Sequence, residues 1–294
     1  MAFNLATGCD TEPVAINAKG TIIGNSYTDG EFCSAFERLR GGTFVYPREP
    51  VLAMNKEGEI TGNNRAGLPY LRRADGSEIT FSLHIDGHKR ESLVAVAINS
   101  RGAIAGHYSY LLKGPPRRGG TLGFLRTRNG TITTFGCPDS TSGTWIIGTN
   151  DLGATVSRFG SSPMKGCIHN PDGTSTVFDA GGDTFPTAIN DAGYVTGLVD
   201  LHGVGQKGFV RAPDGTITLF DGYPHSINAA GTITGEYGVF DGVYQGFVRA
   251  ADGTITVFNV DSATYTRPVS INDRGIITGA FGGNNNYQGF IRFP

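Results

Sequence analysis

The stretch Gly208–Glu236, GFVRAPDGTITLFDGYPHSINAAGTITGE, decides the fold. Two short runs of β-branched and aromatic residues, 208–211 and 216–220, flank the pair Asp214-Gly215, which is typical of a hairpin turn with two positive-φ positions. A second hairpin pattern follows over 226–235, where Gly231 is the residue most able to turn the chain. The stretch therefore predicts strands three and four of one unit and strands one and two of the next.

The same pattern recurs along the whole chain. An Asn-x-x-Gly sequence marks the first hairpin of each unit, at intervals of 38 to 51 residues, at Asn17, Asn55, Asn99, Asn150, Asn190, Asn228 and Asn272. Four short strands per repeat of about 40 residues are typical of a β-propeller blade. We expect one all-β domain over residues 1–294, a seven-bladed β-propeller with four antiparallel strands per blade. The chain ends on a third strand, 289–293, so we expect the N-terminal segment 2–6 to complete the last blade.

Composition excludes several function classes. The chain has 24 Lys and Arg against 26 Asp and Glu, a net charge of -2, and no basic block of the kind that nucleic acid requires. No run approaches a membrane span. Phosphate loops, nucleophile elbows, paired metal-binding histidines and dinucleotide fingerprints are not found, so we expect no cofactor, no metal, no nucleic-acid partner and no membrane partner.

The four cysteines fall at matching places in two units. Cys9 and Cys33 bracket the first Asn mark, and Cys137 and Cys167 bracket the fourth. This predicts two disulfides, Cys9 to Cys33 and Cys137 to Cys167, and hence an extracellular or otherwise oxidising compartment, with four free or buried thiols as the alternative. The start MAFNLATG lacks the features of a signal peptide, so either the protein is intracellular or a leader is absent from this chain.

The segments after strands two and four vary in length, whereas the hairpin turns are mostly short. Variable loops on a rigid scaffold usually carry function, so we expect a ligand pocket at the central mouth of the loop-bearing face. The residue after the second-strand Gly, or after Ser157, differs from unit to unit: Asn25, Asn63, His107, Arg158, Leu198, Glu236 and Ala280. The next position and the ends of the first strands add Tyr108, Phe159, Tyr237, Phe281, Arg90, Trp145, His225 and Arg267.

These residue types suggest acid–base chemistry at that mouth. His107 and His225 are candidates for an acid and base pair near neutral pH, with Glu236 as proton acceptor and Tyr108 and Tyr237 in the same catalytic group. The ligand-binding candidates fall into three groups. Arg158, Arg90 and Arg267 could clamp a carboxylate or developing anion, and Trp145 could stack on a flat ligand. The remaining rim positions are Asn25, Asn63, Phe159 and Phe281. Each has a structural alternative: hydrogen-bonded wall histidines, arginines paired with carboxylates, and a packed tryptophan.

A family resemblance follows from the same motifs. The order Gly-Phe-Val-Arg, Asp-Gly, Ser-Ile-Asn and Gly-x-Ile-x-Gly resembles the extracellular repeats of the HAF family over essentially the whole chain. The tripeptide behind the family name is present only in altered form, as Ser34-Ala35-Phe36. The resemblance implies a secreted propeller-type repeat protein and supplies no catalytic residues.

Two function classes remain open, besides a purely structural repeat protein. The first is a cofactor-independent lyase, cyclase or isomerase with one asymmetric pocket for a small organic or saccharide ligand. The second is a non-catalytic propeller that binds glycan or protein. Because the rim residues differ between units, the sequence favours one pocket over a set of equivalent sites, and it leaves the oligomeric state open.

Overall fold

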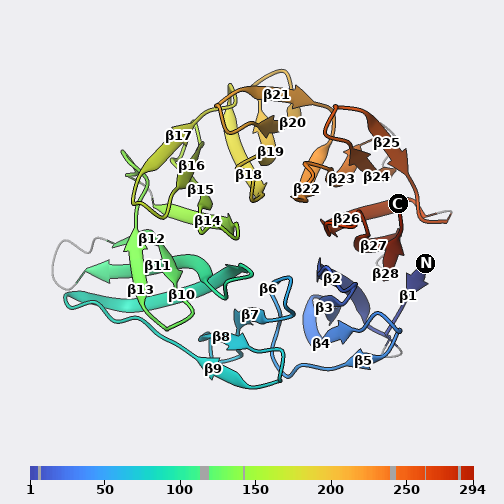
Figure 1. The fold of residues 1–294 in the computed structure, drawn as a ribbon, viewed down its shortest axis with the longest axis horizontal. Helices are drawn as coiled ribbons and strands as arrows, with labels where there is room; N and C mark the ends of the chain where they lie inside the picture. The colour runs from blue at the N-terminus through green and yellow to red at the C-terminus, as the bar shows by residue number, and fades with distance from the viewer. Residues whose placement is uncertain (6–7, 113–118, 142, 239–242, 262, 284–285) are drawn as a thin grey trace.

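The computed structural model describes residues 1–5, 8–112, 119–141, 143–238, 243–261, 263–283 and 286–294, and in this part every regular element is a β-strand. Figure 1 shows the sheets arranged as a ring around a central axis, with β2, β6, β10, β14, β18, β22 and β26 innermost. The chain is therefore an all-β propeller, as predicted. The described residues include no helix that is long and apolar enough to cross a bilayer.

Five sheets are separate and four-stranded. They are β2 (Asp10–Ile16), β3 (Ile22–Thr28), β4 (Glu31–Arg38), β5 (Phe44–Val45); β6 (Ala53–Met54), β7 (Ile60–Asn63), β8 (Pro69–Arg72), β9 (Glu78–Thr80); β10 (His88–Ile98), β11 (Ile104–Leu112), β12 (Gly119–Arg126), β13 (Ile132–Phe135); β14 (Thr144–Thr149), β15 (Thr155–Phe159), β16 (Lys165–His169), β17 (Ser175–Phe178); and β18 (Asp183–Ile189), β19 (Val195–Asp200), β20 (Gln206–Arg211), β21 (Ile217–Phe220).

The remaining strands form one eight-stranded sheet, which corrects the predicted count of seven separate blades. It contains β22 (Tyr223–Ile227), β23 (Ile233–Gly238), β24 (Tyr244–Arg249), β25 (Ile255–Phe258), β26 (Tyr265–Ile271), β27 (Ile277–Gly283), β28 (Asn286–Arg292) and β1 (Ala2–Phe3). The physical reason is a parallel pairing of Tyr244 in β24 with Tyr265 in β26, which joins the last two predicted units. The ring therefore holds five separate blades and one double sheet.

The N-terminal strand completes the sheet that ends the chain, as predicted. Ala2 and Phe3 pair with Phe290 and Gly289 in antiparallel register, and β1 lies beside β28 in Figure 1. The Phe3 ring covers the face of Gly289 so closely that a Cβ there would lie 2.3 Å from a ring carbon. The strand is shorter than the predicted segment 2–6.

The Asn marks link each unit to the next. Asn228 accepts the Thr232 N–H at 2.9 Å through Oδ1, which closes its own turn, and donates from Nδ2 to the Asn272 carbonyl oxygen at 3.2 Å. The same side-chain link to the next mark is made by Asn55, Asn99, Asn150, Asn190 and Asn272. Because buried amides need partners, these asparagines are fixed by the scaffold.

The Asp-Gly turns differ from the predicted geometry. Gly215 has a positive φ of 95°, but Asp214 is not among the residues with positive φ. The Asp214 side chain instead accepts the Thr216 N–H at 2.9 Å, while Ala212 N–H donates to the Thr216 carbonyl oxygen. The turn therefore needs one left-handed residue rather than two, and the aspartate serves it through its side chain.

The core lies between neighbouring sheets. Phe209, in the third strand of its sheet, is fully buried and meets Phe178 of the preceding sheet edge-on at 6.1 Å between centroids. Arg211 lies over the same Phe178 ring at 5.4 Å. Equivalent Phe and Arg side chains recur around the ring, so the repeated third strand is a packing element.

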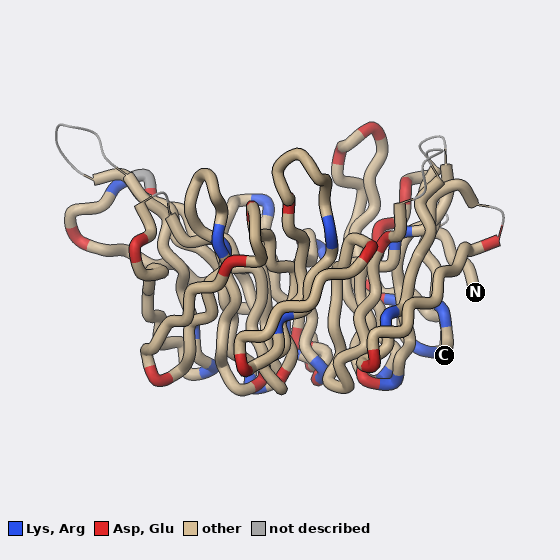
Figure 2. Tube along the Cα trace, turned by 90° about the horizontal axis from the view of Figure 1, so that it is seen from above, with Lys and Arg blue, Asp and Glu red and all other residues tan. Residues whose placement is uncertain are grey.

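The two rims of the ring differ. Figure 2 shows loops that rise to unequal heights on one rim and short, even turns on the other. The Asn turns lie on the even rim, because they join the first and second strands of each unit. We call the two rims the loop rim and the turn rim.

Candidate functional site

A cluster of four side chains forms at the junction of β22, β23 and β26. Glu236 Oε1 lies 3.1 Å from Arg267 Nε and 3.6 Å from His225 Nε2, and it accepts the Tyr265 hydroxyl at 3.4 Å. Three of the four residues were predicted as site residues, and the structure brings them together. Tyr265 was missed, because it begins its strand two residues before Arg267 and its type alone gives no signal.

A β-bulge places His225 in this cluster. Pro224 pairs with Gly235 and Ser226 with Thr234, so His225 is the extra residue between them. Bulges redirect a side chain and often lie next to functional sites. Gly235 is required opposite the bulge, since a Cβ there would lie 2.0 Å from the Tyr223 carbonyl oxygen.

The pKa values of the groups in this cluster are shifted in different directions. Burial, with a smaller effect of the Arg267 charge, lowers the pKa of His225 to about 4. Burial raises the pKa of Glu236, although Arg267 and Tyr265 act against it. Burial and the Glu236 charge raise the pKa of Tyr265 to about 12. At neutral pH the site therefore presents a neutral imidazole beside a neutral phenol and a guanidinium.

Access differs among these side chains. The Glu236 side chain is 14% exposed, whereas that of Arg267 is 45% exposed. The arginine can therefore contact a ligand while the carboxylate holds it in place. Such an arrangement combines a proton acceptor, His225, with a cation that stabilises negative charge.

Two predicted rim residues have structural roles. Asn25 donates from Nδ2 to the Val51 carbonyl oxygen at 2.9 Å and accepts the Val51 N–H at 3.0 Å. Asn63 bonds Leu93 and Ala95 of the next sheet in the same way. The residue after the second-strand Gly thus faces the next sheet, and in these two units its amide bonds the main chain within that sheet's inner strand or just before it.

His107 and Arg158 occupy the same position in the next two units. Burial and the nearby Arg158 charge lower the pKa of His107. Arg158 lies over the Phe185 ring of the following sheet, 5.9 Å from its centroid. The prediction places His107 and His225 on opposite sides of one mouth, and among the described residues no hydrogen bond or ring contact joins them.

Tyr108 belongs to a separate group at the loop rim. Its hydroxyl donates to Glu91 Oε1 in a very short hydrogen bond and lies 2.9 Å from His88 Nδ1. Glu91 also lies 2.5 Å from His84 Nδ1. The hydrogen bond from Tyr108 is the largest of several effects that lower the pKa of Glu91 to about 2. The carboxylate is therefore ionised and satisfied by its neighbours.

The remaining predicted residues are placed as follows. Trp145 is half-buried in β14 opposite Arg158. Phe159 and Phe281 are buried, Phe159 beside the two cysteines Cys137 and Cys167 and Phe281 in a cluster with Phe290. Tyr237 packs partly buried against the cluster around Phe247. Arg90 lies in β10, but its side chain is outside the described part of the structure.

A cavity lies at the turn rim, on the other side of the ring from the predicted pocket. It has a volume of about 330 Å³ and is lined by the Asn turns and by the ends of the innermost strands next to them. None of the predicted catalytic or ligand-binding residues lines it. Small side chains such as Ala15, Ala97 and Gly148 leave this space around the axis.

Lys56 is the central charge at this rim. Its Nζ lies 3.0, 3.3 and 3.4 Å from carboxylate oxygens of Asp151, Asp191 and Asp273. Burial acts to lower the pKa of Lys56, but the three carboxylates outweigh it and raise that pKa. The sequence carried a signal for this group, because all four residues directly follow an Asn mark.

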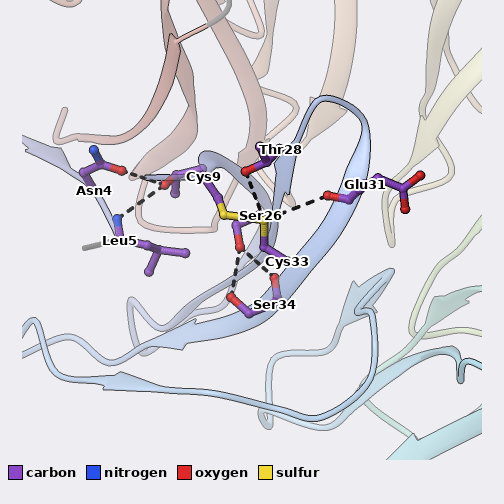
Figure 3. Close-up of a disulfide and its surroundings, with 9 residues drawn as sticks. Asn4, Leu5, Cys9, Ser26, Thr28, Glu31, Cys33 and Ser34 are labelled. Carbon is purple, nitrogen blue, oxygen red and sulfur yellow. Dashed lines mark hydrogen bonds between the residues drawn. A yellow bond between two sulfur atoms is a disulfide. The ribbon is translucent and has the colours of Figure 1, made fainter. Parts of the chain in front are cut away.

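One of the two predicted disulfides is formed. Cys9 and Cys33 are bonded across 24 residues, and Figure 3 shows the bond between the segment entering β2 and the start of β4, with Thr28 3.2 Å from Cys33 Sγ. Cys137 and Cys167 are free thiols, which corrects the second prediction. Both are buried against Phe159, and Cys137 Sγ lies 3.1 Å from Ser157 Oγ, so burial and hydrogen bonding satisfy them without a bond. The described residues hold no group of three metal-ligating side chains.

Comparison with known proteins supports the fold. No family model matches the sequence, and no curated protein matches it. Virginiamycin B lyase from Staphylococcus aureus is similar in structure, with a TM-score of 0.64, 15% sequence identity and coverage of 100% of this chain and 99% of that one. Its catalytically inactive variant with quinupristin gives the same values. The propeller domain of a Trilobed protease from Pyrococcus furiosus has a TM-score of 0.49 and 6% identity over 97% of this chain and 83% of that one. At 15% identity the likeness to virginiamycin B lyase shows a propeller fold and nothing finer.

Proposed function

We propose that this protein is a cofactor-independent enzyme of the lyase, cyclase or isomerase type, acting on one small organic or saccharide ligand at the loop rim. The observation that carries the proposal is the convergence of His225, Glu236, Arg267 and Tyr265 around one carboxylate oxygen. The likeness to a lyase propeller is consistent with this reaction class but, at 15% identity, does not carry the proposal.

The proposed chemistry is proton transfer at a carbon next to a carbonyl group. Neutral His225 takes the proton from that carbon, and the electron pair moves onto the carbonyl oxygen, where Arg267 stabilises the enolate. In an elimination the electron pair returns to expel a leaving group on the adjacent carbon. In an isomerisation the same pair takes up a proton at a new position. The proton that His225 takes up passes to the Glu236 carboxylate, whose Oε1 lies 3.6 Å from His225 Nε2 and whose raised pKa favours accepting it. Glu236 then gives this proton to the leaving group or to the new carbon, and Tyr265 orients its carboxyl group.

The test uses substrates whose products absorb ultraviolet light. Purified protein is incubated with a panel of lactones, β-hydroxy acids and uronic-acid oligosaccharides, and formation of a conjugated double bond is followed by absorbance. We expect His225→Ala and Glu236→Gln to lose turnover by about 100-fold or more, the usual contribution of a general acid or base. Binding of the same substrate should persist in both variants. Unchanged turnover in His225→Ala would rule out the proposed base.

A second candidate function is binding without catalysis, of a glycan or a protein. The cavity at the turn rim favours it, because about 330 Å³ lies within the usual range of ligand sites and no acid–base group lines it apart from the ion-paired Lys56 cluster. Saturable binding that is lost on filling this cavity, for example by Ala97→Phe, with no turnover in the substrate panel, would favour this candidate over the enzyme.

We also propose that the protein works in an extracellular or otherwise oxidising compartment. The Cys9–Cys33 disulfide supports this, since such bonds persist where the thiol pool is oxidised. The resemblance to the HAF repeats points the same way. Loss of the disulfide in protein isolated from its native cells under thiol-trapping conditions would contradict the proposal.

A further inference from the structure

Two polar side chains in neighbouring sheets have no partner. His107 in β11 and Arg158 in β15 take the position that follows the second-strand Gly or Ser, and neither side chain makes a hydrogen bond or ion pair with any described residue. In three other units the same position is bound to the next unit, by Asn25, Asn63 and Glu236. Of the four units without this link, two carry the apolar Leu198 and Ala280, and the other two, which are consecutive, carry the polar His107 and Arg158.

The unpaired atoms are shielded from solvent. His107 Nδ1 and Arg158 Nε are both buried without a partner. A buried polar group without a hydrogen bond is destabilising, and more so when it is charged. His107 and Arg158 take the same position in two consecutive units, in β11 and β15. Two neighbouring units therefore each carry a buried polar atom with no acceptor or donor from the described residues.

Other arginines show that an unpaired Nε alone is not unusual here. Arg126, Arg211 and Arg249 also have a buried, unpaired Nε and lie over a Phe ring. Each of these also donates from Nη1 to the carbonyl oxygen of the following residue. Arg158 has the ring contact but no acceptor, and it has an unpaired histidine beside it. This combination separates Arg158 from the scaffold arginines.

We infer that His107 and Arg158 bind an anionic oxygen group, a carboxylate or a phosphate, on the ligand of this protein. Arg158 supplies the charge and a planar set of donors, and His107 donates from Nδ1 in the corresponding tautomer. The inference rests on the proposed function for its role, because it narrows the substrates to anionic molecules. It does not depend on that function for its test, which measures binding alone.

The test is a titration with three probes, sodium acetate, inorganic phosphate and sodium sulfate, at constant ionic strength. Binding is followed by the imidazole NMR signals of histidine-labelled protein. We expect saturable shifts of the His107 signals and a loss of affinity of about tenfold or more in Arg158→Met, the usual effect of one charge-assisted pair. Comparing acetate with phosphate decides which of the two oxygen groups fits.

Matched variants complete the experiment. Arg274→Met removes the same charge from an exposed position on the turn rim and should leave the affinity unchanged. Arg158→Lys keeps the charge and should retain part of the affinity, which guards against a folding defect in Arg158→Met. Glu236→Gln should bind the probes like the natural protein even if it abolishes turnover, so failure of the enzyme proposal remains distinguishable. Equal affinity in Arg158→Met, or no saturable binding of any probe, would overturn the inference.

Discussion

Asn272 Nδ2 donates to the carbonyl oxygen of Asn17 at 2.9 Å, across 255 residues of sequence. This bond joins the two ends of the ring at the turn rim, where Asn272 is 6% exposed. Asn272→Asp keeps Oδ1 as acceptor for the turn but removes the donor. We expect it to lower the free energy of unfolding by about 1–3 kcal/mol, because a buried carbonyl oxygen then faces a carboxylate. Urea denaturation followed by fluorescence measures the change.

Asn17→Asp is the matched control. The Asn17 side chain closes its own turn in the same way, but among the described residues its Nδ2 has the Met54 sulfur as its one partner, at 3.8 Å. It therefore loses a weaker contact. If both variants lost the same stability, the closing bond would contribute nothing beyond the effect of a buried charge.

Lys56 should stabilise the turn rim in a pH-dependent way. Burial acts to raise the pKa of Asp151, but hydrogen bonds from Ser100 and Lys56 outweigh it and lower that pKa. A lowered pKa means that the stabilisation is present above the ordinary carboxyl pKa and is lost as the pH falls through the folded value. Lys56→Met should therefore destabilise the protein at neutral pH by about 1 kcal/mol, since the Lys56 side chain is 42% exposed.

The measurement is the free energy of unfolding at neutral pH and at about pH 2, well below the ordinary carboxyl pKa. The loss in Lys56→Met should shrink at the lower pH and at high salt. Lys19→Met, at an exposed position of another Asn turn, serves as control and should change little. A loss that is independent of pH would mean that Lys56 stabilises through packing rather than charge.

Features that depend on residues close together in the sequence were predictable, and features that depend on contacts between distant residues were not. The turns at Asn228 and Gly215 are encoded by residues a few positions apart, so the repeat and its strands were predictable. The pairing of Tyr244 with Tyr265 joins two units through one contact that no local pattern signals, so the count of separate blades was wrong.

The site was predictable only in part, for a similar reason. Alternation along a strand indicates which residues lie near the axis. The side chains of Asn25 and Asn63, however, are hydrogen-bonded to main-chain groups of the next unit. Residue type alone does not reveal these hydrogen bonds. The bulge that redirects His225 depends on pairing with β23, although the position of Glu236 after Gly235 did point to the cluster.

The cysteines give a direct chemical test of the structure. With four cysteines in the chain and Cys9 bonded to Cys33, thiol titration in denaturant without reductant should find two reactive thiols. In the native state Cys137 and Cys167 are buried and should react far more slowly than after unfolding. A count of four would remove the disulfide, and a count of zero would show that Cys137 and Cys167 are bonded to each other.

His225 should make stability depend on pH in the acid range. Its pKa is lowered by burial from an ordinary value of 6.5 to about 4, so between these two values the unfolded chain binds a proton that the folded protein excludes. Stability is therefore complete above the ordinary value and decreases as the pH falls from there toward about 4, by at most about 1.4 kcal/mol per pH unit. His225→Gln should flatten the stability curve over this interval, whereas His202→Gln, at an exposed position, should not. Urea denaturation at several pH values measures both curves, and parallel curves for His225→Gln and the natural protein would show that the imidazole is already charged in the fold. Since a neutral imidazole is the proposed base, a lowered pKa also predicts that turnover persists down to about pH 4.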